Sequence, residues 1–206
     1  MMRHAENVVL LRDIPRFPFR KFEDLQRAEL RKEIKVGAAM DYSRQWLVSD
    51  DPAVPRRAKI KVQWLMASHL FFPAGIILHV VQTGEPHVLW WLGVASLAFL
   101  ILQPAAVRQS SLLRLVLIFG FLALAASLFG LAGDWAGWLG LSIIYPWLIN
   151  RTLYKAATSG VITAALSDER LFVRLFKQSI VAISLPDGKQ VWAHDCLDTS
   201  RDTNVH

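Results

Sequence analysis

Long apolar runs occupy the middle of this chain, between Val62 and Ile149; the sequence before them is polar and basic, and the sequence after them is mixed. A helix of about 20 apolar residues crosses the roughly 30 Å hydrocarbon core of a bilayer. Four runs approach or reach that length, and only a few residues separate them: 62–81, 88–107, 112–132 and 135–149. The pattern predicts a membrane protein of the all-α class, with a four-helix transmembrane bundle over residues 62–150.

A soluble protein that buries the same runs as core helices is the alternative. Core helices usually keep a polar face toward water, and none of these four runs has one. The fourth run, 135–149, is the shortest, and it needs its flanking residues to complete a crossing. A re-entrant hairpin is therefore the alternative for that run.

The basic residues predict the orientation in the membrane. Residues 1–61 contain 14 of the 23 Lys and Arg residues, and residues 150–206 contain seven. Between the spans, only the middle connection is basic, with Arg108 and Arg114. Lys and Arg gather on the cytoplasmic side, so we expect an inner-membrane protein with both termini in the cytoplasm. This topology accounts for the net charge of +6, and we expect no nucleic-acid partner.

Tryptophan and basic residues mark the ends of the predicted spans. Indole rings favour the membrane–water interface, and cations favour its cytoplasmic side. The predicted inner anchors are Arg56, Arg57, Lys59, Lys61, Trp64 and Trp147, and the predicted outer anchors are Trp90, Trp91, Trp135 and Trp138.

Small residues cluster around the third turn of the predicted bundle. Lipid gives little hydrophobic drive for helix association, so small residues matter because they allow close approach. The predicted packing residues of the third and fourth helices are Ala126, Gly130, Gly133, Gly137 and Gly140. Pro73 lies in the middle of the first span, where it removes a backbone hydrogen bond and predicts a kink.

The flanks predict cytosolic structure. Residues 1–61 form a basic segment with helices over Phe22–Val36 and Ala38–Val48. In residues 151–198, a helical extension to Thr158 precedes a small β-meander, because four short runs are rich in β-branched and aromatic residues: 161–166, 171–176, 180–185 and 190–194. So small a sheet is not stable alone, and we expect it to pack on the N-terminal segment, the membrane or a partner. Residues 199–206 are predicted to be disordered.

His69 and Arg114 are the candidate intramembrane polar residues. Polar side chains within spans are rare and often functional, but simpler roles are open to both. His69 would hydrogen-bond a neighbouring helix, and Arg114 would extend to lipid headgroups. The spans contain no acidic residue between their ends, which weakens a proton- or cation-coupled transporter.

Two short clusters contain metal-ligand residue types. They are His79, Glu85 and His87 near the first outer turn, and His194-Asp195-Cys196 near the C-terminus. Loops gather such residues without binding a metal, and the common catalytic motifs are missing. We therefore predict no catalytic residue, no metal site and no cofactor.

A non-enzymatic role fits these observations best. The sequence predicts a small inner-membrane binding or accessory protein, for example an immunity protein against a toxin or a subunit of a membrane complex. Its expected partners are the lipid bilayer and another protein, or a second copy of itself. A small transporter or channel subunit is one alternative, and a membrane enzyme that uses histidines and a metal is another.

Overall fold

The computed structural model describes residues 10–102 and 111–197, and it is mostly helical. The chain divides into two compact units. We call residues 1–62 with 154–206 the flank unit, and residues 63–153 the central unit. The two flanks, which the sequence suggested as separate segments, therefore form a single unit. The predicted disordered tail 199–206, span residues 103–107 and Arg108 lie outside the described residues.

Helices dominate the described part of the flank unit. Its N-terminal elements are η1 (Leu11–Asp13), α1 (Phe22–Leu30), β1 (Lys35–Ala38), α2 (Met40–Val48) and the start of α3 (Arg56–Ser68). Its C-terminal elements are the end of α8 (Asp134–Ala165), α9 (Glu169–Lys177), β2 (Val181–Ser184), β3 (Gln190–Val191) and α10 (Ala193–Leu197).

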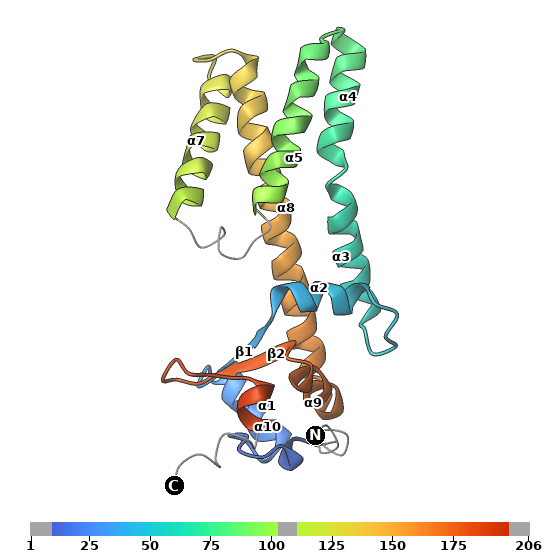
Figure 1. The fold of residues 1–206 in the computed structure, drawn as a ribbon, viewed down its shortest axis with the longest axis vertical. Helices are drawn as coiled ribbons and strands as arrows, with labels where there is room; N and C mark the ends of the chain where they lie inside the picture. Colours follow the sequence, from blue (N-terminus) through green and yellow to red (C-terminus); the bar gives the residue numbers. More distant parts are fainter. Residues whose placement is uncertain (1–9, 103–110, 198–206) are drawn as a thin grey trace. The chain divides into compact units, whose positions relative to one another are not determined.

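A small antiparallel sheet joins the two flanks. Its order is β1-β2-β3, with Lys35 opposite Ser184 and Ile183 opposite Val191. Figure 1 shows β1 beside β2, although the whole central unit lies between them in the sequence. The Val36 amide donates to the Glu29 carboxylate at 2.9 Å, so a backbone donor of this edge strand has a partner.

Two of the predicted strands are wrong. Residues 161–165 complete α8, and residues 171–176 lie in α9. In α9 the side chains of Phe172, Val173, Leu175 and Phe176 are buried, which matches the period of a helix. The Asp168 carboxylate also accepts a hydrogen bond from the Leu171 amide at 3.0 Å, and this N-cap favours a helix over a strand. The predicted helix over 22–36 is too long, since α1 ends at Leu30 and β1 begins at Lys35.

An aromatic core fixes α9 to the N-terminal flank. The ring of Phe17 lies edge-on to Phe176, with centroids 5.2 Å apart, and Phe22 lies 6.0 Å from Phe172. The Leu11 amide donates to the Glu169 carboxylate at 2.8 Å. These contacts join residues from opposite ends of the chain into one hydrophobic core.

Asp51 is the polar centre of the loop after α2. Its carboxylate accepts hydrogen bonds from the Ala53 amide at 2.9 Å and from the Trp46 indole at 3.2 Å. It also lies 2.8 Å from the Arg174 guanidinium of α9. The Ala53 bond, with smaller effects of Trp46 and Arg174, lowers the pKa of Asp51 below its usual range, against an opposing effect of burial.

The described helices of the central unit correspond in place to the predicted spans. They are the end of α3, α4 (Phe71–Thr83), η2 (Pro86–Leu89), α5 (Trp90–Leu102), α7 (Ser111–Leu128) and the start of α8. One helical stretch of the described chain, 56–83, is long and apolar enough to cross a membrane, while 86–98 and 113–128 are shorter apolar helices. The four-span bundle therefore stays a prediction.

The two units differ in how far their large apolar side chains are exposed. In the flank unit, residues such as Leu25, Phe172 and Ile183 are fully buried. In the central unit, large apolar side chains are exposed on every long helix, among them Trp64, Leu78, Leu97, Leu122 and Leu148. So extensive an exposed apolar surface is typical of a protein that contacts a membrane or another protein.

Helices α7 and α8 approach each other closely at glycine. A Cβ atom on Gly140 would lie 2.6 Å from the Gly120 carbonyl oxygen, and one on Gly137 would lie 2.8 Å from the Ser127 hydroxyl. Of the small residues predicted to pack, Gly137 and Gly140 thus lie against α7. Gly130 and Gly133 fall between the two helices, in the turn, and Ala126 accepts the hydrogen bonds that end α7. Gly120 was not predicted.

Replacing Asp51 should destabilise the flank unit. Asp51→Ala leaves the Trp46 and Arg174 donors without this carboxylate, and we expect a loss of about 2 kcal/mol in unfolding free energy. Because the folded-state pKa is lowered, the carboxylate stabilises the fold above its ordinary unfolded-state pKa. That contribution disappears as the pH falls through the folded-state value. Thermal unfolding of the detergent-solubilised protein between pH 3 and 7 measures both effects.

Asp50→Ala is the matched control for Asp51→Ala. The Asp50 side chain is fully exposed and pairs only with Lys59 among the described residues, so its loss should leave the melting temperature nearly unchanged. Equal melting temperatures for the two variants would contradict the role given to Asp51.

Adding a methyl group at Gly140 should separate α7 from α8. The new Cβ atom would meet the backbone of Gly120, and such overpacking costs roughly 1–3 kcal/mol. We expect Gly140→Ala to lower the melting temperature in detergent. Gly93→Ala is the control, because nothing lies within 4 Å of its added Cβ atom. If both variants have the same melting temperature, the glycine contact does not contribute to stability.

Candidate functional site

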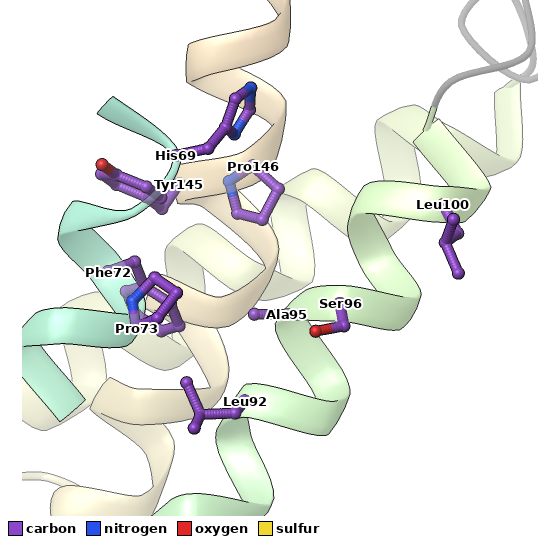
Figure 2. Close-up of a pocket in the computed structure, with 9 residues that line it drawn as sticks. All are labelled: His69, Phe72, Pro73, Leu92, Ala95, Ser96, Leu100, Tyr145 and Pro146. Atoms are coloured by element: carbon purple, nitrogen blue, oxygen red, sulfur yellow. The ribbon is translucent and has the colours of Figure 1, made fainter. Parts of the chain in front are cut away.

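A cavity of about 330 Å³ lies within the central unit. Three helical segments line it (Figure 2). The broken helix α3–α4 contributes His69, Phe72 and Pro73, helix α5 contributes Leu92, Ala95, Ser96 and Leu100, and helix α8 contributes Tyr145 and Pro146. The cavity is the best candidate for a site, because ligand pockets are usually apolar with a few polar groups.

A break between α3 and α4 forms one wall of the cavity. Helix α3 ends at Ser68 and α4 begins at Phe71. Pro73 has no amide hydrogen, so it cannot donate to the carbonyl four residues earlier. The Tyr145 hydroxyl of α8 donates to a different carbonyl at the break, that of Ser68. The kink expected from Pro73 is thus a short interruption of the helix, with a backbone group bonded to a neighbouring helix.

Helix α8 supplies the opposite wall. Pro146 lies inside this helix, next to Tyr145, whose ring stacks on Phe72 with centroids 5.5 Å apart and an interplanar angle of 25°. The buried Ser142 hydroxyl lies 3.4 Å from the Trp91 carbonyl oxygen. Pro73 and Pro146 therefore lie at the same cavity. Hydrogen bonds from Ser142 and Tyr145 join α8 to the neighbouring helices there.

The lining of the cavity is neutral. None of its nine residues carries a formal charge when His69 is neutral, and the polar ones are His69, Ser96 and Tyr145. Because Tyr145 already donates its hydroxyl proton to Ser68, its oxygen acts toward a ligand as an acceptor. The hydroxyl of Ser96 and an imidazole N–H of His69 are then the side-chain donors that line the cavity.

The structure separates the two predicted intramembrane polar residues. His69 lines the cavity, whereas Arg114 lies near the start of α7, is exposed and is not part of the lining. Its position at a helix end is compatible with the alternative role at lipid headgroups.

The predicted tryptophan anchors fall into three groups. Trp64, Trp90 and Trp135 are well exposed, as an interfacial indole would be. Trp138 instead packs on the His79 ring at 5.1 Å. The Arg151 guanidinium carbon lies 5.1 Å above the Trp147 ring centroid. Trp91, partly covered, forms a third environment through its carbonyl contact with Ser142.

The predicted basic anchors also differ among themselves. Lys59 donates to the Ser49 carbonyl at 2.9 Å and to the Asp50 carboxylate at 3.1 Å. It therefore ties α3 to the preceding loop. The exposed basic side chains of this group are Arg56, Arg57 and Lys61.

Both histidine clusters contain histidine–carboxylate pairs. Glu85 lies 3.9 Å from His79 and 3.8 Å from His87, which are ion-pair distances. In the part of the chain that the structure describes, no three His, Cys, Asp or Glu side chains are placed to hold a metal ion. Near the C-terminus, burial raises the pKa of the Cys196 thiol, and the Asp195 carboxylate raises it further. A protonated thiol is a poor ligand and a poor nucleophile.

Sequence reasoning found one wall of the cavity and missed the others. It singled out His69 and Pro73, but Ser96, Tyr145 and Pro146 were not proposed as site residues. A Tyr-Pro pair inside an apolar run was the available signal, because proline frees backbone groups that polar neighbours then satisfy.

Comparison with known proteins identifies no relative. No family model, no curated protein and no solved structure matches the chain significantly. The site is therefore interpreted from its own geometry.

Removing the Tyr145 hydroxyl should loosen the helix break. Tyr145→Phe keeps the stacked ring but deletes the bond to Ser68, and we expect a loss of about 1 kcal/mol. Hydrogen exchange should become faster at residues 68–72 and stay unchanged in the flank unit. Tyr42→Phe is the control, because Tyr42 is exposed. Unchanged exchange at the break in Tyr145→Phe would show that the bond is not needed there.

Proposed function

We propose that the chain is a multi-pass protein of a bacterial-type inner membrane, with the central unit in lipid and both termini in the cytoplasm. The inverted burial of the central unit supports this location, since its helices expose apolar side chains that water would not favour. The orientation rests on charge. Glu85 and Asp134 lie at the two turns at one end of this unit (Figure 1). Arg114 and Arg151 lie far along α7 and α8 from those turns, so the basic end faces the cytoplasm.

We further propose a non-enzymatic binding or accessory role. The observation that carries it is that both flanks fold together into one unit with its own core. A chain that needed only a membrane anchor would not require such a unit. The surface of this unit also exposes a few large apolar side chains, including Leu30 and Tyr42, and exposed apolar residues are common in contacts with another protein. Toxin immunity and membership of a membrane complex are concrete forms of this role.

Capture of a partner from native membranes tests the proposal. We expect the full chain, fused at its C-terminus to a fluorescent protein, to be fluorescent, to stay in the membrane fraction and to retain a specific partner or a second copy. The double substitution Leu30→Ser with Tyr42→Ser should weaken that retention by about tenfold or more, by analogy with interface residues that each contribute roughly 1–2 kcal/mol.

Val81→Ser is the matched control for the capture experiment, because Val81 is equally exposed but lies in the central unit. Release of the chain into the supernatant without detergent would overturn the membrane location. A chain that stays in the membrane but retains no partner and does not self-associate would overturn the accessory role alone.

A small transporter or channel subunit is a second candidate, favoured by the cavity at the broken helix. Interrupted helices beside a cavity are a feature of substrate sites in transporters. The neutral lining would limit such a substrate to an uncharged molecule. Solute flux in proteoliposomes that is lost in His69→Ala would favour this function over the accessory role.

A further inference from the structure

The cavity in the central unit is suited to a neutral ligand. Its nine lining residues include no acidic or basic side chain apart from His69, whose imidazole can be neutral. Placing a carboxylate, phosphate or ammonium group there would bury a charge without a partner, which is strongly unfavourable. A ligand that fits this cavity would therefore be an uncharged molecule, and one that partitions into an apolar environment.

The polar side chains of the cavity can donate hydrogen bonds to a ligand. Ser96 presents a hydroxyl on α5, and His69 presents an imidazole at the helix break (Figure 2). Tyr145 has committed its proton to the Ser68 carbonyl. A carbonyl oxygen matches this arrangement, because it accepts a hydrogen bond without needing to donate one.

The aromatic wall favours a flat ring. Phe72 and Tyr145 stack on each other at 5.5 Å and 25°, and both line the cavity together with the rigid rings of Pro73 and Pro146. Flat π-systems pack well against aromatic side chains in offset or edge-on arrangements. A flexible acyl chain would gain no comparable advantage from this wall.

The size of the cavity and its position indicate a ligand with a tail. A volume of about 330 Å³ is near the lower end of the range of roughly 300–1,000 Å³ for small-molecule pockets. It accommodates a substituted ring but not a long chain. Leu100 lines the cavity and is 65% exposed, so the cavity reaches the apolar surface of the unit beside α5. A chain attached to the ring can leave there.

We propose that this cavity binds the head group of a lipid-soluble quinone, with its apolar chain leaving past Leu100. The quinone ring lies against Phe72 and Tyr145, and its carbonyl oxygens accept hydrogen bonds from Ser96 and His69. The site rests on the membrane location proposed above, since such ligands dissolve in the bilayer. It goes beyond the accessory role, because it gives the central unit a ligand of its own.

A decyl-substituted benzoquinone is the probe for this site. The full-length chain in nanodiscs should retain it saturably, in excess of empty nanodiscs, with one quinone per chain. Ser96→Leu fills the cavity and should weaken binding about tenfold or more, because an added side chain and the ring cannot share the space. Ser96→Ala keeps the cavity open but removes a donor, and it should weaken binding about three- to tenfold.

Gly93→Leu is the matched control, since Gly93 lies on the same helix, is exposed and has open space around it. Its affinity should stay within about twofold of the parent chain. Decylbenzene, which has the same chain but no carbonyl groups, should fail to displace the quinone.

Three results would overturn the quinone site. They are no saturable retention by the membrane-bound chain, equal binding by Ser96→Leu and the parent chain, and equal displacement by decylbenzene. The last result would show that the cavity recognises the alkyl chain alone. If the chain also leaves the membrane fraction without detergent, the proposed membrane location fails too. If it stays in the membrane but does not bind the quinone, only the quinone site fails.

Discussion

The structure of this chain depends on one constraint: its large apolar side chains need an apolar environment. In the flank unit they find it inside, around Phe172, Phe176 and Ile183. In the central unit the same kinds of side chain point outward from every long helix. Burial of apolar area is worth about 25 cal/mol per Å², so a water-exposed central unit would forgo much of its stabilisation. The lipid surroundings proposed for this unit would remove that penalty, and its remaining contacts could then be few and specific.

The contacts that remain in the central unit are those that a lipid environment would demand. Close backbone approach at Gly120 and Gly140 gives van der Waals contact where hydrophobic association is weak. Hydrogen bonds from Ser142 and Tyr145 join neighbouring helices at main-chain carbonyls. The flank unit, by contrast, relies on an aromatic core and on buried or half-buried polar bonds such as Leu11 to Glu169 and Asp51 to Arg174.

The sequence predicted the helices of the central unit better than the structure of the flanks. Apolar runs mark the positions of α4, α5 and α7 directly, because length and composition are local properties. The strand β1 at Lys35–Ala38 was not predictable in this way, since its partner β2 lies at the other end of the chain. The error over 171–176 was avoidable. Asp168 as N-cap, Glu169 in the first turn and Lys177 in the last turn are helix signals in the sequence, and they should have outweighed the aromatic and β-branched content.

The candidate site was predictable only in part for the same physical reason. His69 and Pro73 stand out as a polar residue and a helix breaker within one apolar run. Ser96 and Tyr145 reach the cavity only because α5 and α8 lie beside the break. The local sequence does not predict that arrangement of helices. A cavity is a property of facing surfaces, so the residues on one surface can suggest it but cannot define it.

A single bond connects the helix break with the chemistry of the cavity. An interrupted helix leaves backbone carbonyls that an apolar environment cannot satisfy, and the Tyr145 hydroxyl satisfies the one at Ser68. That bond holds the Tyr145 ring against Phe72, which builds the flat wall. It also uses the tyrosine proton, which leaves Ser96 and His69 as the donors toward a ligand. The flat hydrogen-bond acceptor proposed for the cavity thus fits the way in which the chain stabilises its own broken helix.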